Sequence, residues 1–113
     1  MKELQVFNHE EFGEVRALEL GGEPWFVGKD VAEKLAYNEP NKAITRHVDE
    51  DDRIKHPIKD NLGRTQRSWI INESGLYSLI LSSQLPRAKE FKRWVTSEVL
   101  PSIRQNGGYI VNQ

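Results

Sequence analysis

Eight polar or basic side chains in the middle of the chain have the chemistry needed to bind nucleic acid. They lie on the polar face of segment 40–48 and along the segments that follow it: Asn41, Lys42, Thr45, Arg46, Lys55, Lys59, Arg64 and Arg67. Ammonium and guanidinium groups bind phosphate oxygens, whereas asparagine and arginine can also form paired hydrogen bonds with base edges. The expected phosphate contacts are Lys42, Lys55, Lys59, Arg64 and Arg67. Asn41 and Arg46 are the candidates for reading base sequence.

No group of residues predicts catalysis, a metal site or a cofactor site. The three histidines are scattered, and no cysteine is present to complete a zinc site. Ser74 lacks the glycine two residues earlier that a nucleophile elbow requires, and its position at a helix start fits capping. The acidic run 49–52 lacks the ligand spacing of a calcium loop, so we interpret it as a solvated connector. We expect neither enzymatic activity nor a cofactor.

The charge of the chain is unevenly distributed. A formal net charge of −1 and a pI near 6.3 argue, on their own, against a nucleic-acid binder. Residues 1–39 hold 4 Lys or Arg and 9 Asp or Glu, a balance of −5, whereas from Arg53 onward 10 basic and 4 acidic residues give +6. A positive face is therefore feasible. The alternative is that these charges are merely solvated.

The length and composition predict one cytoplasmic domain. A chain of 113 residues can form a single hydrophobic core but not two independent ones. No apolar run approaches the roughly 20 residues of a membrane helix, and the N-terminus does not resemble a signal peptide. We therefore expect no membrane association.

The first half of the chain is predicted to contain strands followed by a helix pair. Segment 4–9 is an expected strand, and 14–20 and 23–27 flank a Gly-Gly turn, which indicates an acidic hairpin whose carboxylates point outward. Segments 29–37 and 40–48 are expected short helices. Their expected inner residues are Val31, Ala32, Leu35, Ile44 and Val48. Such a pair is a helix-turn-helix pattern, in which the second helix usually reads DNA.

A basic hairpin is predicted next, from segments 53–59 and 64–71 joined by a turn at 60–63. The expected inward residues are Ile54, Ile58, Trp69 and Ile71, and the basic side chains project as in the wing of many helix-turn-helix proteins. A ribbon of this kind can lie along a phosphate backbone. The alternative is a surface hairpin whose charges prevent aggregation.

Two packed helices are predicted to end the chain. Asn72 is the expected cap of the first helix, and Pro86 is expected in the first turn of the second. Apolar residues at steps of three and four form the expected inner face of the second: Phe91, Trp94, Val95, Val99 and Ile103. Pro101 should kink this helix or end its regular part, and the helix should stop at 106–108. The large aromatics, Trp69 among them, are interpreted as core residues rather than base-stacking platforms.

Two long stretches of the sequence resemble a known family. The stretches "FGEVRALELGGEPWFVGKDVAEKL" and "WIINESGLYSLILSSQLPRAKEFKRWVTSEVLPSIRQNGGYI" are similar to the Bro-N domain found at the N-terminus of prophage antirepressors and of proteins from large DNA viruses. The resemblance implies a DNA-binding module, covering residues 1–113, of a phage-type transcription regulator. It also implies that the chain is the N-terminal part of a longer antirepressor. Similar proteins commonly have glycine where this sequence has Ala36, so we expect either a different turn or a longer helix there.

We therefore expect an α+β domain with an N-terminal hairpin, a helix pair, a basic hairpin and two C-terminal helices. The first functional hypothesis is binding of double-stranded DNA. The second is a protein-interaction module that binds a phage repressor or another regulator, with Glu14, Glu19 and Glu23 of the acidic hairpin as the docking face. Helix-turn-helix proteins often pair to match two half-sites, which leaves a homodimer open.

Overall fold

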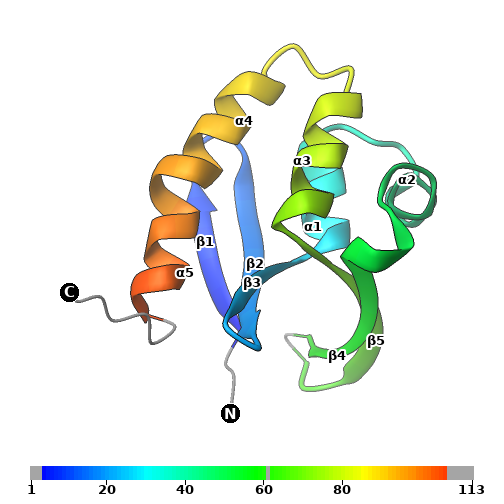
Figure 1. The fold of residues 1–113 in the computed structure, drawn as a ribbon, viewed down its shortest axis with the longest axis vertical. Helices are drawn as coiled ribbons and strands as arrows, with labels where there is room; N and C mark the ends of the chain where they lie inside the picture. The colour runs from blue at the N-terminus through cyan, green and yellow to red at the C-terminus, as the bar shows by residue number, and fades with distance from the viewer. Residues whose placement is uncertain (1–3, 61, 107–113) are drawn as a thin grey trace.

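The computed structural model describes residues 4–60 and 62–106. In this part of the chain, helices pack on one face of a five-stranded antiparallel sheet of order β1-β2-β3-β5-β4 (Figure 1). The elements in chain order are β1 Gln5–His9, β2 Gly13–Leu20, β3 Glu23–Val27, α1 Gly28–Lys34, α2 Pro40–His47, η1 Glu50–Asp52, β4 Arg53–Lys59, β5 Thr65–Asn72, α3 Glu73–Ser82, α4 Ala88–Trp94, η2 Val95–Val99 and α5 Leu100–Asn106. The expected α+β fold is confirmed.

The main hydrophobic core lies between the sheet and the helices. Strands contribute Val15, Ala17, Phe26 and Ile71, and the helices contribute the residues predicted from their spacing. All of these predicted helical residues are buried: Val31, Ala32, Leu35, Ile44, Val48, Phe91, Trp94, Val95, Val99 and Ile103. A second, smaller cluster was not predicted and lies on the opposite face of the sheet, where Leu18, Val27, Ile58 and Ile70 meet.

The C-terminal helices begin and bend for identifiable reasons. Asn72 caps α3 as predicted, because its Oδ1 accepts a hydrogen bond of 2.9 Å from the backbone N–H of Gly75. Pro86 is not in the first turn of the next helix, because α4 begins at Ala88 after a turn that contains the proline. The predicted interruption at Pro101 is confirmed and takes the form of a π-helical segment, η2, which ends two residues before the proline.

The π-helical segment has a physical cause in the proline that follows. Proline has no N–H to donate, and its ring clashes with the carbonyl four residues earlier in a regular α-helix. The wider turn of η2, in which the Leu100 N–H donates to Val95 O, changes the spacing at that point and lets the helical run continue into α5. The predicted stop at 106–108 falls partly outside the described residues, because 107 and 108 are not among them. No helix in the described ranges is long and apolar enough to cross a membrane.

The helix pair is joined by a turn that differs from both sequence-based expectations. Helix α1 ends at Lys34, and Ala36 itself takes the left-handed conformation, with φ of 68°. The N–H of Tyr37 donates to Ala32 O at 3.0 Å and that of Ala36 to Glu33 O at 3.1 Å, which is the Schellman arrangement of a helix end. An alanine therefore stands where glycine is usually favoured.

Replacing Ala36 by glycine is expected to stabilise the protein by about 1 kcal/mol, because glycine adopts a left-handed backbone without the Cβ clash. Ala36 is exposed, so the substitution removes no core contact. The same substitution at Ala43, buried inside α2, is the control and should destabilise by about 1 kcal/mol or more. Urea unfolding of both variants measures the difference. Equal effects of both substitutions would contradict the strained turn.

Candidate nucleic-acid interface

Helix α2 is held firmly against the rest of the fold. Ala43 and Ile44 form its buried side, and Ile44 lies against the start of α1, where a Cβ added at Gly28 would come within 2.6 Å of Ile44 Cδ1. Tyr37, in the turn between the helices, donates its hydroxyl to Leu79 O of α3 at 2.8 Å. Burial raises the pKa of this hydroxyl, so it is neutral and remains a donor. These contacts fix which face of α2 is presented to solvent.

The outer face of α2 carries all four side chains predicted for it. Asn41, Lys42, Thr45 and Arg46 are exposed. Lys42 Nζ lies 3.0 Å from Glu39 Oε1, but both side chains are more than half exposed, so the pair is easily exchanged for another anion. Thr45 donates to carbonyls of its own helix, and its hydroxyl oxygen still has capacity to accept. The prediction of a polar outer face is confirmed, whereas contact with DNA stays a prediction.

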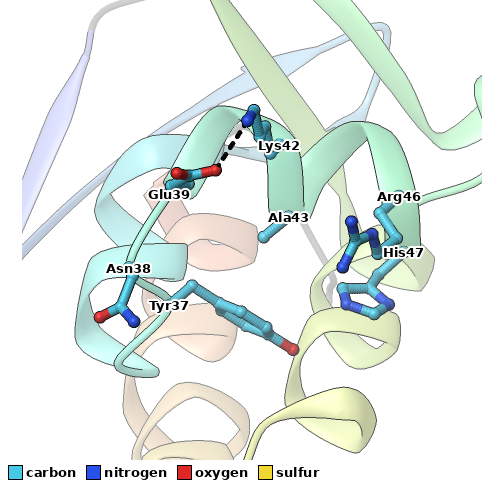
Figure 2. Close-up of a pocket in the computed structure, with 7 residues that line it drawn as sticks. All are labelled: Tyr37, Asn38, Glu39, Lys42, Ala43, Arg46 and His47. Atoms are coloured by element: carbon cyan, nitrogen blue, oxygen red, sulfur yellow. Dashed lines mark ion pairs between the residues drawn. The ribbon is translucent and has the colours of Figure 1, made fainter.

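A shallow depression of about 280 Å³ lies beside α2. Figure 2 shows residues of its lining: Arg46 and His47 lie together on the side toward which the Tyr37 ring points, whereas Lys42 points toward Glu39. The rings of Tyr37 and His47 are 5.6 Å apart. Three nitrogen-bearing side chains against one carboxylate, that of Glu39, make this a surface suited to a phosphate oxygen.

The basic hairpin has a different facial pattern from the one predicted. Lys55 pairs with Trp69, Pro57 with Arg67 and Lys59 with Thr65, so Lys55, Lys59 and Arg67 share one face with Trp69 and Ile71. Ile54, Ile58 and Ile70 lie on the other face, and Ile54 is exposed. The expectation that Ile54, Ile58, Trp69 and Ile71 point inward together is therefore wrong. Both faces of β5 are partly covered, so the adjacent Ile70 and Ile71 are both buried. Two buried neighbours hide the alternation of inward and outward residues that would reveal the register of the strand.

Arg64 lies apart from the other basic residues of the hairpin. It stands in the turn at the end of β4 and β5, where its Nε is 3.0 Å from Asp60 Oδ2. The backbone N–H of Arg64 also donates to Asp60 Oδ1, and this bond is the main reason that the pKa of Asp60 lies below its usual value. Asp60 is thus charged at neutral pH and organises the turn. The joined ends of β4 and β5 lie away from α2 (Figure 1).

Arg53, which is outside the predicted set of site residues, connects the hairpin to α2, and Trp69 lies beside it. Arg53 donates a hydrogen bond from Nη1 to the carbonyl of Val48, which caps the end of α2. Its guanidinium carbon also lies 5.1 Å from the ring centroid of Trp69, and Lys55 Nζ lies 4.7 Å from the same centroid. Trp69 is half-buried, so it is not a plain core residue: its ring packs against the main core while two cations approach it.

This arrangement brings some of the predicted residues together and separates others. Lys55 lies beside Arg53 and hence near the end of α2, whereas Lys59, Arg67 and Arg64 follow toward the hairpin turn. The pairing of β4 with β5 determines which basic side chains share a face. This pairing depends on a strand register that the sequence pattern alone did not reveal. The spacing of Arg53 and Lys55, two residues apart on one strand, was the available signal for a shared face.

The acidic hairpin is not uniformly exposed. Glu14 and Glu23 are exposed as predicted, but Glu19 is buried, with 6% of its surface accessible. The expectation that Glu19 belongs to an outward docking face is therefore wrong. The cause is its register opposite Pro24, on the face of the sheet that the helices cover. Glu11, in the preceding turn, forms an ion pair with Arg87.

Comparison with known proteins identifies the family. The model described as "BRO family, N-terminal domain" matches residues 14–101, which include α2 and the basic hairpin. A Bro-N domain-containing protein of Invertebrate iridescent virus 6 is 38% identical over 109 residues, covering 80% of this chain and 26% of that protein. An uncharacterised protein of Haemophilus influenzae is 37% identical over 109 residues, covering 95% of this chain and 53% of that protein. No solved structure gives a match.

A third relative, an uncharacterised Bro-N domain-containing protein of Acanthamoeba polyphaga mimivirus, is 36% identical over 95 residues, covering 75% of this chain and 39% of that protein. The chain thus spans about a quarter to about half of the length of these relatives. The resemblance drawn from the sequence is confirmed. The chain belongs to the BRO family and contains the family's N-terminal domain, Bro-N.

Proposed function

We propose that this Bro-N domain binds double-stranded DNA through the outer face of α2 and the basic face of the β4–β5 hairpin. The observation that carries the proposal is the connection made by Arg53, which bonds to the last turn of α2 while its guanidinium lies against Trp69 of the hairpin. This contact holds α2, the helix proposed to read DNA, in a fixed orientation relative to the basic β4–β5 hairpin. Fixed geometry favours binding because less conformational freedom is lost on association.

The dimensions of α2 suit a DNA groove. An α-helix with its side chains is about 10–12 Å across, which matches the width of the major groove, about 12 Å. The eight residues of α2 give it a length of about 12 Å along the groove. In this geometry Asn41 and Arg46 reach base edges, and Lys42 contacts phosphate. Lys55, Lys59, Arg64 and Arg67 follow the backbone beside the groove and supply most of the affinity.

The family resemblance also supports a biological role. We infer that the domain belongs to an antirepressor-type transcription regulator of a phage or prophage, which acts on DNA in the cytoplasm. The match to the Bro-N family and the placement of basic side chains on α2 and the hairpin support this role. No step of the proposed function requires a metal or cofactor.

Fluorescence anisotropy of a labelled duplex tests the proposal, with a duplex of about 25 base pairs, long enough for two half-sites one helical turn apart. The protein is titrated at several salt concentrations, and binding should be saturable with log K falling linearly against log salt. The slope, about −0.9 for each phosphate contact, estimates how many contacts form. Absence of binding at low salt by the folded protein would contradict the proposal.

A further inference from the structure

An apolar groove lies between α3 and α4, on elements that take no part in the proposed DNA interface. Its volume is about 290 Å³, and its lining consists of Tyr77, Ile80, Leu81 and Lys92. Figure 1 shows α3 and α4 adjacent and joined by the loop that contains Pro86. The groove is small compared with pockets for drug-sized ligands, which hold about 300 to 1,000 Å³. It therefore suits one or two side chains of a peptide.

Leu81 gives the groove an apolar edge with no cover. The inner side of α3 is formed by Leu76, Leu79 and Ile80, which places Leu81 on the solvent side, where 84% of its surface is accessible. A single exposed leucine is ordinary in a folded protein. Here, however, it borders the same hollow as Ile80 and the half-buried ring of Tyr77. Covering such a side chain contributes favourably to association because apolar surface leaves water.

Lys92 lines the groove, and two further cations are exposed elsewhere on α4. Lys92 Nζ lies 6.0 Å from the centroid of the Tyr77 ring, and Lys89 and Arg93 are exposed on the same helix. Within residues 4–60 and 62–106, none of these three cations forms an ion pair. The neighbouring carboxylates are already engaged, since Glu73 pairs with Arg104 and Glu90 with Arg87. Lys92 at the groove, and Lys89 and Arg93 on the exposed side of α4, are therefore available to an external anion.

We propose that this groove binds an acidic segment of a protein partner that inserts one large apolar side chain between Tyr77 and Leu81. Carboxylates of the segment meet Lys89, Lys92 and Arg93, and the apolar side chain covers Ile80 and Leu81. Charge complementarity selects an acidic sequence, and the apolar floor selects a protein segment over a nucleic acid, which has no leucine-like group to place there. This surface is separate from the DNA interface and does not depend on it.

Selection from a library of random 16-residue peptides tests the proposal, with the folded protein as the target and the Leu81→Asp variant as the counter-selection. Enriched peptides should carry net negative charge and at least one Leu, Met, Phe or Trp. Anisotropy of an enriched peptide should show at least tenfold weaker binding to Leu81→Asp and to Lys92→Glu. Leu62→Asp is the matched control, because it places the same charge at another exposed leucine, in the hairpin turn.

Each other outcome would overturn the proposal. The selection would exclude an acidic segment as the occupant if no peptide is enriched, or if the enriched peptides are neutral or basic. Equal binding of an enriched peptide to Leu81→Asp and to the wild-type protein would exclude it as well. Displacement of the peptide by duplex DNA would assign the groove to nucleic acid. Sedimentation of the wild-type protein as a dimer and of Leu81→Asp as a monomer would assign it to a second copy of the chain.

Discussion

Replacing Lys59 and Arg67 together by alanine is expected to weaken duplex binding about 60-fold at about 0.1 M salt, because each lost phosphate contact removes about 0.9 of a log unit there. Both residues lie on the basic face of the hairpin and are exposed. Neither side chain has a hydrogen bond or ion pair within the described ranges, so the fold should be unaffected. The slope of log K against log salt should become shallower by about 1.8.

The matched control removes the same two charges from another surface. Lys89→Ala with Arg93→Ala changes the net charge equally but acts on α4. Its effect on duplex binding should be within about threefold, since distant charges are largely screened beyond about 10 Å at this salt concentration. Equal losses in the two double variants would show that net charge, rather than the hairpin, determines binding.

Replacing Asp30 by alanine is expected to lower the free energy of unfolding by about 3 kcal/mol, because it leaves a partly buried guanidinium and a backbone N–H without their acceptor. Asp30 has 7% of its surface accessible. Its Oδ2 accepts from Arg16 N at 3.0 Å and from Nε at 2.8 Å, and its Oδ1 accepts from Nη2 at 2.9 Å. The hydrogen bonding of the Arg16 guanidinium to the Asp30 carboxylate is also the main cause of the raised pKa of Arg16.

This pair matters for the proposed interface because it attaches the first turn of α1 to β2. Asp30→Asn is the conservative variant: it keeps an acceptor oxygen but loses the charge, and should cost about half as much. Urea unfolding followed by circular dichroism measures both variants. A loss below about 1 kcal/mol for Asp30→Ala would mean that water replaces the carboxylate at little cost.

The helices were predictable because their apolar residues recur at intervals that one helix face can bury. Val31, Ala32 and Leu35 in α1, and Ile44 with Val48 around α2, satisfy this rule and are buried. The polar face of α2 followed directly, since residues that alternate with a buried stripe must be exposed. The presence of the basic hairpin was likewise visible from its turn residues and charges.

Apolar spacing could not predict which side chains lie on each face of the β4–β5 hairpin, nor that two cations approach the ring of Trp69. Ile70 and Ile71 are both buried because residues cover each face of β5, so the alternation that fixes a strand register is hidden. The conformation of Ala36 was predicted wrongly, because the cost of a left-handed alanine, about 1 kcal/mol, favoured a different turn or a longer helix. The structure keeps the left-handed residue together with both hydrogen bonds of the helix end. The Arg16 and Asp30 pair depends on the path of the chain between two elements, which local pattern does not encode.

Backbone amide NMR spectra of the ¹⁵N-labelled protein, recorded during titration with duplex DNA, test directly whether α2 and the β4–β5 hairpin bind DNA. We expect the largest shifts in α2 and in β4 and β5, including the amides of Arg46, Lys55 and Arg67. Little change should occur in α4 or in β1. Shifts concentrated on α4, with α2 and the hairpin unchanged, would contradict the proposed interface.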